Sequence, residues 1–190
     1  MEMTIGKIRP SPTNPRRVFN GIDELAESIK AQGILQELLV RPIEHDEYEV
    51  EIVFGERRFR AAKAAGLTFV PVQVRNMGDK EAHELQMIEN VQREDLTLLE
   101  EADGYQALVD RHGYTVDQIV ERTGKTRATV YARLKLASLT KDAREALESG
   151  RMVASTALLV ARVPMALQAR ALKLVARDGE PRSAREAMDA

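Results

Sequence analysis

Hydrophobic residues in the first 75 positions follow a strand-like pattern in some segments and a helical pattern in others. Three segments are short, β-branched or alternating, and bounded by Gly, Pro or charged residues: 38–42, 48–53 and 70–74. Such segments are typical of strands, and together they predict a small sheet. Apolar positions at helical spacing from Ile22 predict a helix that ends at Gly33, and the Ala-rich run from Glu56 predicts another that ends at Gly66.

After residue 78 the pattern is helical throughout. Ala82, Leu85 and Ile88 form one apolar stripe, and Leu98 begins another. Shorter helical segments follow from Thr115 onward, separated by Gly, Ser or Pro. The predicted fold class is therefore an α+β N-terminal domain, with a small mixed sheet and helices, followed by an all-α helix-turn-helix domain.

The chain has 190 residues, which is enough for two small domains. We expect the domains to span residues 1–97 and 98–182, with 183–190 as the start of a further helix or a linker. A helix that opens after Ser183 would be cut off at Ala190, which suggests truncation there, although a frayed natural terminus is the alternative interpretation.

A helix-turn-helix is predicted in the second domain. Thr115 and Gln118 have the spacing of a capping box, in which each side chain bonds a free backbone N–H group of the first helical turn. Gly124 suits a tight turn with positive φ, and Thr126 is placed to cap a second helix. An ordinary helical hairpin is the alternative interpretation.

The second helix of this motif is expected to face inward with Val130 and Leu134, which leaves its first turns free to enter the major groove. Arg127 can bond guanine with two parallel hydrogen bonds. Arg133 and Lys135 are better placed for phosphates, which position a protein without reading sequence. The residues predicted to contact DNA are Gln118, Lys125, Thr126, Arg127, Ala128, Thr129, Tyr131, Arg133 and Lys135.

Charge is distributed unevenly along the chain. Residues 1–112 hold 14 Lys and Arg against 21 Asp and Glu, a net charge of −7, whereas residues 113–190 hold 14 against 9, a net charge of +5. A basic C-terminal half favours nucleic acid as a partner, although a solvated helical surface has the same composition. The lack of Cys excludes thiol nucleophiles, disulfides and thiolate zinc sites. No apolar run is long enough to span a membrane, so we expect a cytoplasmic protein without a membrane partner.

A site for a polyanion is predicted at Gly55-Glu56-Arg57-Arg58, where a strand passes into a helix. The backbone N–H groups of a first helical turn carry partial positive charge, Gly lets a ligand approach the main chain, and Arg supplies forked donors. Arg residues on an ordinary solvated helix would give the same pattern.

Two further segments carry candidate ligands. Glu89-Asn90-Val91-Gln92-Arg93 brings a carboxylate, amides and an Arg together late in a helix. Mg²⁺ prefers one or two such oxygens together with nucleotide phosphates, although a polar helix end is the simpler interpretation. The loop at 12–19 adds further cations between the first strand and the first helix.

Taken in order, these segments resemble the ParB family of DNA partition proteins, also called the ParB/Spo0J/Noc family. The resemblance begins at Ile8 and runs to Gly150, so it covers nearly the whole chain. Besides the helix-turn-helix, the matching segments are 25–29, 33–36, 39–41, 55–62, 70–72 and 89–93.

The resemblance implies a switch operated by CTP. The residues implied to bind CTP are Thr13, Asn14, Arg16, Gly55, Glu56, Arg57, Arg58, Gln92 and Arg93. Glu89 and Asn90 are implied to hold Mg²⁺ and to serve a slow hydrolysis of CTP. The implied DNA partner is a double-stranded palindromic site of the parS kind, around which a homodimer closes as a sliding clamp on the nucleoid or a plasmid. The family also implies a ParA-type ATPase as partner and a C-terminal dimerisation domain, which we expect to be absent from this chain.

Three positions depart from the usual family pattern. Asn14 stands where Gln is usual, Ser11 where Asn is frequent, and Phe54 where a small residue commonly precedes the turn. The sulfiredoxin relatives of this fold need a catalytic Cys, so their chemistry is excluded. Two other functions stay open: a transcriptional repressor of the same architecture that uses no nucleotide, and a metal-dependent nuclease, although the usual cluster of carboxylates and His is not visible.

Overall fold

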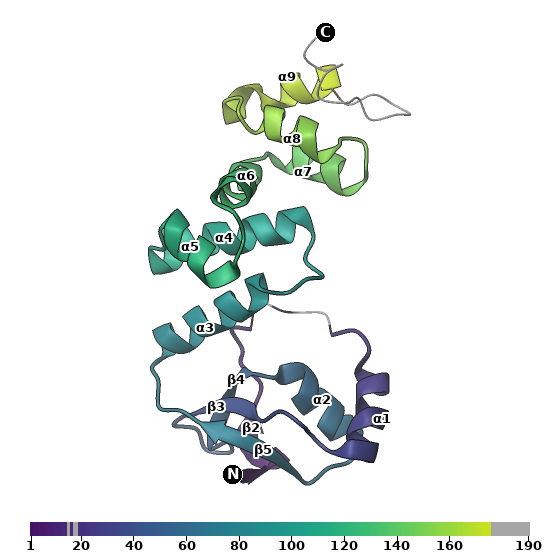
Figure 1. Ribbon diagram of the computed structural model, residues 1–190, viewed down its shortest axis with the longest axis vertical. Helices are drawn as coiled ribbons and strands as arrows, with labels where there is room; N and C mark the ends of the chain where they lie inside the picture. The colour runs from purple at the N-terminus through teal and green to yellow at the C-terminus, as the bar shows by residue number, and fades with distance from the viewer. Residues whose placement is uncertain (15, 17–18, 176–190) are drawn as a thin grey trace. The chain divides into compact units, whose positions relative to one another are not determined.

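A computed structural model describes residues 1–14, 16 and 19–175. The chain divides into two compact units, of which the first ends at Asn90 and the second begins at Val91. The first unit is a mixed sheet with helices and the second is helical (Figure 1). This arrangement confirms the predicted fold class. The helix expected after Ser183 lies outside the described residues.

Within the described residues the first unit has a five-stranded sheet in the order β1-β5-β3-β4-β2. The strands are Glu2–Thr4 (β1), Ile8–Arg9 (β2), Leu38–Pro42 (β3), Val50–Phe54 (β4) and Phe69–Val74 (β5). β1 runs antiparallel to β5 and β3 antiparallel to β4, whereas the β3–β5 and β2–β4 pairs are parallel. The sequence pattern predicts the three longer strands. It places a first strand before the loop at 12–19 but gives no bounds for β1 and β2, because two or three residues are too few to establish a period.

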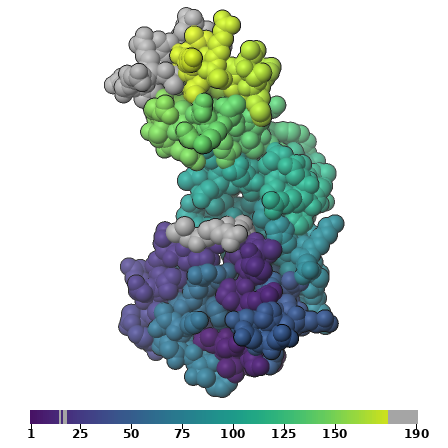
Figure 2. Space-filling model, turned by 180° about the vertical axis from the view of Figure 1, so that it is seen from behind, coloured from purple at the N-terminus to yellow at the C-terminus, as the bar shows by residue number. Residues whose placement is uncertain are grey.

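Two helices of the first unit, α1 (Ile22–Gln32) and α2 (Glu56–Ala64), pack against each other and contribute to one core with the sheet. Each is followed by Gly with positive φ, 72° at Gly33 and 80° at Gly66, as the sequence predicts. Seen from behind, the purple N-terminal residues lie at the surface of this unit (Figure 2), where Met1 is 69% exposed.

Helix α3, Asp79–Val91, spans the boundary between the two units. The helices that follow are Leu98–His112 (α4), Val116–Thr123 (α5), Arg127–Ala137 (α6), Lys141–Glu148 (α7), Ala154–Val160 (α8) and Met165–Val175 (α9). α6 packs against both α4 and α5, and α7, α8 and α9 share a core with α4 and α6. In the described part of the chain, every helix is too short or too polar to cross a membrane.

The predicted capping signals of the helix-turn-helix are confirmed. Thr115 and Gln118 form a capping box at the start of α5, Gly124 has a φ of 68°, and Thr126 caps α6. The predicted inward face of α6 is only partly right, because Leu134 is half-buried whereas Leu136 is fully buried. Leu136 belongs to the core that α6 shares with α7, α8 and α9, so the helix is covered on a second side.

Candidate nucleotide and DNA sites

The turn from β4 into α2 leaves no room for a side chain at Gly55. Its φ is 96°, in the left-handed region that L residues rarely adopt. A Cβ atom built there would lie 2.7 Å from Cδ2 of Leu38 and 3.1 Å from a guanidinium nitrogen of Arg58. The backbone at the N-terminus of α2 can therefore be approached closely, as binding of a phosphate group requires.

Glu56, the first residue of α2, is buried and fully engaged with protein partners. One carboxylate oxygen accepts a hydrogen bond from Nδ2 of Asn14 at 2.6 Å, and the other accepts two from Arg60 at 2.6 and 2.8 Å. Glu56 thus holds the loop that contains Asn14 against the N-terminus of α2.

The two adjacent Arg residues of the turn have different surroundings. Arg58 donates from one terminal nitrogen to the backbone carbonyls of Gln36 and Glu37. Burial lowers the pKa of the Arg58 guanidinium, an effect that the charge of Glu89 opposes. Arg57 is exposed, lies near Gly21, and has no hydrogen bond or ion pair with any residue that the structure describes. Arg57 is therefore the cation of this turn that is best placed for a ligand.

The loop before α1 is folded back on itself by its own side chains. The hydroxyls of Ser11 and Thr13 are 3.0 Å apart, and Oδ1 of Asn14 accepts a hydrogen bond from the backbone N–H of Arg16 at 2.9 Å. The guanidinium of Arg16 lies 5.2 Å from the ring centroid of Phe19. Of the predicted loop 12–19, residues 15, 17 and 18 lie outside the described residues.

The Glu89–Arg93 segment is divided between the two units. Glu89 is exposed and Asn90 half-buried, late in α3 of the first unit. In the second unit Gln92 donates to the carbonyl of Arg122, and Arg93 forms a bidentate ion pair with Asp95 at 2.7 and 2.9 Å. The described residues contain no group of three or more His, Asp or Glu that could hold a metal ion without help from a ligand.

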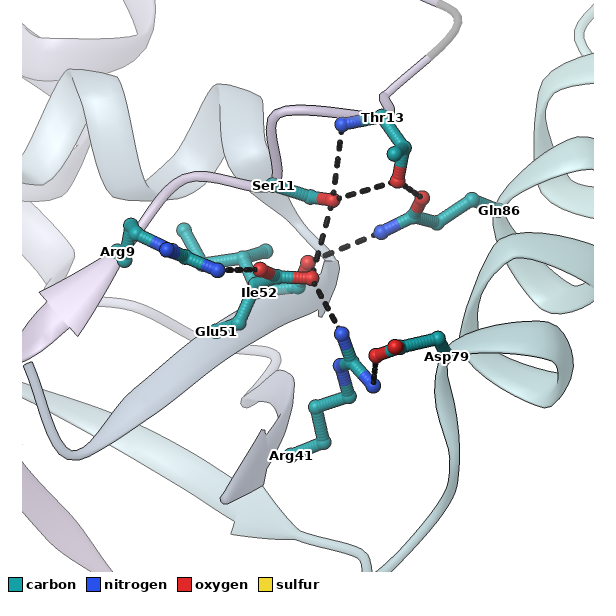
Figure 3. Close-up of polar contacts among 8 residues, drawn as sticks. All are labelled: Arg9, Ser11, Thr13, Arg41, Glu51, Ile52, Asp79 and Gln86. Atoms are coloured by element: carbon teal, nitrogen blue, oxygen red, sulfur yellow. Dashed lines mark hydrogen bonds and ion pairs between the residues drawn. The ribbon is translucent and has the colours of Figure 1, made fainter. Parts of the chain in front are cut away.

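A buried charge network that sequence reasoning missed lies beneath the loop (Figure 3). Glu51 of β4 is 2% exposed and forms ion pairs with Arg9 and Arg41. Arg41 also pairs with Asp79 at the start of α3, at 2.5 Å, and the hydroxyl of Ser11 donates to Glu51 at 3.1 Å. Burial of a carboxylate is tolerated here because two cations neutralise it.

Gln86 of α3 is a second buried polar residue absent from the sequence prediction. It is 3% exposed, accepts a hydrogen bond from the hydroxyl of Thr13 at 3.2 Å, and donates to the carbonyl of Ile52 at 3.2 Å (Figure 3). A signal for Gln86 was present in the sequence, since it lies four residues after the buried Ala82 and hence on an apolar face of the helix.

The predicted DNA-reading face of α6 is exposed in its first turns. Ala128, Tyr131 and Lys135 are all solvent-accessible, and Tyr131 is 53% exposed. Arg127 is also exposed but pairs with Asp117 in the first turn of α5, a residue that sequence reasoning did not single out. Other predicted contacts also have structural roles: the hydroxyls of Thr126 and Thr129 bond each other at 2.9 Å, and Gln118 completes its capping box.

Arg133, predicted to contact phosphate, is held on the inner side of the same unit. Its Nε donates to Glu101 of α4 at 2.6 Å, and its side chain is 20% exposed. The other carboxylate oxygen of Glu101 accepts from the hydroxyl of the buried Tyr105 at 2.8 Å. Burial acts to raise the pKa of Glu101, but the hydrogen bonds from Arg133 and Tyr105 lower it below its ordinary value. This triad fixes α6 against α4.

Comparison with known proteins places both units in one family. A model described as the ParB N-terminal domain matches residues 1–91, and one described as the ParB HTH domain matches residues 94–187. The chain is 48% identical over 159 residues to the chromosome-partitioning protein Spo0J of Thermus thermophilus, covering 83% of this chain and 58% of that protein. It is 42% identical over 148 residues to a nucleoid occlusion protein of Bacillus cereus, covering 77% and 50%.

The chain spans only 50% to 58% of the length of these two relatives. Among solved structures, a C-terminally truncated chromosome-partitioning protein ParB from Caulobacter crescentus, complexed to the centromeric parS site, has 36% sequence identity and a TM-score of 0.75. That similarity covers 91% of each chain.

Proposed function

The chain belongs to the ParB family, and from this premise we propose that it is a sequence-specific DNA-binding partition protein whose clamp on DNA is closed by CTP with Mg²⁺. Its DNA site is proposed to be a centromere-like palindrome on a chromosome or plasmid. The proposed assembly is a homodimer, served by a ParA-type ATPase.

The DNA-binding part of the proposal is supported by the second unit. It has a capped helix-turn-helix with an exposed recognition helix, and the residues from 113 onward carry a net charge of +5, from 14 Lys and Arg and 9 Asp and Glu. The ParB of Caulobacter crescentus, with 36% identity and a TM-score of 0.75, was solved with the centromeric parS site. We propose that this chain reads a related palindrome through Arg127 and its neighbours on α6.

The nucleotide part depends chiefly on one observation: a turn that excludes a Cβ atom at Gly55, beside the exposed guanidinium of Arg57. These residues fit a triphosphate, with the backbone at Gly55 and the side chain of Arg57 as donors. Arg58 is already bonded to two backbone carbonyls, so it orders the turn at Gly55 and adds positive charge to it.

Glu89 and Asn90 are proposed to bind Mg²⁺ together with the phosphates, since a carboxylate and an amide oxygen suit that ion. Bound Mg²⁺ would neutralise charge on the phosphates and so assist slow CTP hydrolysis. Thr13, Asn14 and Arg16 are proposed to bind the nucleotide as well. Gln92 and Arg93, which belong to the second unit, are proposed to respond to the nucleotide when the clamp forms.

Replacing Arg57 tests the nucleotide site. Arg57→Ala is expected to weaken CTP binding by about 1.5–3 kcal/mol, the range for hydrogen bonds to charged groups, and to leave binding of the DNA site nearly unchanged. Isothermal titration with CTP and Mg²⁺ measures the first effect, and fluorescence anisotropy with labelled DNA the second. Lys63→Ala, at an exposed position in the last turn of α2, is the matched control. Equal CTP affinity in Arg57→Ala and parent would place the phosphates elsewhere.

The nucleoid occlusion protein of Bacillus cereus, at 42% identity over 148 residues, supports nucleoid occlusion as a second candidate function, for which we propose the same architecture but a different DNA site. Selection of bound sequences from a random DNA pool would separate the two candidates. In the same samples, absence of CTP binding would favour a nucleotide-independent repressor, and cleavage of supercoiled plasmid with Mg²⁺ would favour a nuclease.

A further inference from the structure

The segment from Ser11 to Asn14 is anchored at three successive points. Ser11 donates to the buried Glu51 of β4, Thr13 donates to Gln86 of α3, and Asn14 donates to Glu56 at the start of α2 (Figure 3 for the first two). Each anchor lies on a different element of the first unit. The position of this segment is therefore set by tertiary contacts as well as by its own turn.

The Gln86 anchor has a defined orientation. Its Nε2 donates to the carbonyl of Ile52, and this bond turns Oε1 toward the hydroxyl of Thr13. The side chain of Gln86 is buried, so water does not compete for its bond to Ile52, whereas the bond to the exposed Thr13 is part-buried. A buried amide that joins a strand carbonyl to a loop hydroxyl transmits the position of its helix to the loop.

The same helix carries the proposed metal ligands. Glu89 and Asn90 follow Gln86 by three and four residues, a spacing that puts all three on one side of α3. At its other end, α3 is tied to the sheet by the ion pair between Arg41 and Asp79, at 2.5 Å.

We propose that Gln86 is a positioning residue for nucleotide binding, through which α3 sets the Thr13–Asn14 segment in register with Glu89 and Asn90. This inference rests on the proposed nucleotide site. A shift of α3 would move the loop and the metal ligands together, so that nucleotide contacts at either place favour the same position of the helix. The other end of the segment is held by the hydrogen bond from Ser11 to Glu51, which its two Arg partners keep in place.

The first test needs no nucleotide. In Gln86→Met, amide hydrogen exchange at Ser11, Thr13 and Asn14 is expected to rise about threefold to tenfold in the ligand-free protein, because a neutral hydrogen bond that holds the segment is lost. Thr13→Val, which removes only the hydroxyl, is expected to produce the same change. Gln73→Met, at an exposed position on β5, is the matched control. Unchanged exchange at the three amides in both Gln86→Met and Thr13→Val would overturn the proposal.

The second test is a double-mutant cycle on CTP affinity. Gln86→Met and Thr13→Val are each expected to weaken CTP binding about threefold to tenfold, and the double variant no further, because both act through one contact. If the double variant instead loses CTP affinity by the product of the two single losses, Gln86 acts only through general stability, and the proposal is overturned. If the parent fails to bind CTP, the proposed function fails, and the exchange measurement still decides whether Gln86 positions the segment.

Discussion

The backbone at Gly55 is constrained in two separable ways. Its φ of 96° is strained for any L residue, and the space that a Cβ would take is occupied by Cδ2 of Leu38 at 2.7 Å. Gly113 shares the first constraint only, since it lies in the same left-handed region, with φ 69° and ψ 25°, and nothing lies within 4 Å of an added Cβ. At Gly78 no atom lies within 4 Å of an added Cβ, and φ is outside the strained range. The three positions allow strain and steric contact to be measured apart.

We expect Gly55→Ala to lower the free energy of unfolding by about 2–4 kcal/mol, from backbone strain of about 1–2 kcal/mol together with displacement of Leu38. Gly113→Ala should lower the free energy of unfolding only by the backbone strain, and Gly78→Ala should be close to neutral. Urea unfolding of the three variants checks this order. A Gly55→Ala variant no less stable than Gly113→Ala would mean that Leu38 moves aside without cost.

On the scale of a single element, α6 combines residues that read DNA with residues that hold the helix in place. Arg127→Ala is expected to reduce discrimination at one base pair of each half-site by about 1–3 kcal/mol. Lys135→Ala should instead weaken all sequences alike and reduce the salt slope by about 1. Binding to specific and random DNA over a range of salt concentrations measures both. Equal loss on the two DNAs from Arg127→Ala would make Arg127 a phosphate contact.

The contact of α4 with α6 through Glu101 predicts how stability depends on pH. The pKa of Glu101 is lowered from its ordinary 4.5. Ionised Glu101 therefore stabilises the folded state above pH 4.5, and this stabilisation is lost as pH falls through the folded-state pKa. Burial and the hydrogen bond to Glu101 raise the pKa of Tyr105 from 10.0 to about 12, so its contribution is present below pH 10 and is lost between pH 10 and about 12.

Thermal unfolding measured against pH should therefore show a decline at each end. Glu101→Gln is expected to flatten the acid decline and Tyr105→Phe the alkaline one, where the rise in the pKa of Tyr105 from 10.0 to about 12 corresponds to at most about 3 kcal/mol. Tyr131→Phe, with its exposed ring, serves as the control for the alkaline limb. An alkaline decline that persists unchanged in Tyr105→Phe would contradict the assignment.

Local signals made the helices predictable from sequence. The capping box of Thr115 and Gln118 and the helix-ending Gly33 act within one turn of chain, so their pattern alone determines the outcome. The hydrogen-bond partners of Glu51 and Gln86 lie 40 and 34 residues away. Helical spacing places Gln86 on an apolar face, but no local pattern encodes either partner.

The candidate nucleotide site was predictable to the same extent. Gly55 and the two Arg residues after it identify the turn, but the sequence gives no reason to distinguish Arg57 from Arg58. The distinction arises because the carbonyls of Gln36 and Glu37, 22 and 21 residues earlier, lie beside Arg58 only.

On the scale of the whole molecule, the proposed sites lie in different units of one chain, and α3 spans the boundary between these units. If CTP favours engagement of two first units and the DNA site favours opening after Asn90, each ligand must alter the response to the other. Asn90→Ala is therefore expected to retain specific DNA binding but to fail to close at saturating CTP, because a contact that distinguishes the two states is gone.

Closure can be measured by cross-linking single cysteines placed at exposed positions of the first unit, since the natural chain has no Cys. The cross-link yield of the parent protein should rise when CTP and DNA are added, whereas the yield of Asn90→Ala should stay at its ligand-free value. Gln32→Ala, at the exposed end of α1, is the control. Equal responses in parent and Asn90→Ala would remove Asn90 from the switch.

The pairing of β1 with β5 has a consequence for synthesis of the chain. Glu2 pairs with Pro71, so the residues of β1 cannot pair with β5 until about 70 later ones have been synthesised. At about 5–20 residues per second, the N-terminal segment waits several seconds for its partner strand. The helices of the second unit contact near neighbours in sequence and form quickly once synthesised. A chain whose translation stops before residue 71 would contain most of the hydrophobic core residues of the first unit. It would lack most of β5, and so the complete sheet that buries them.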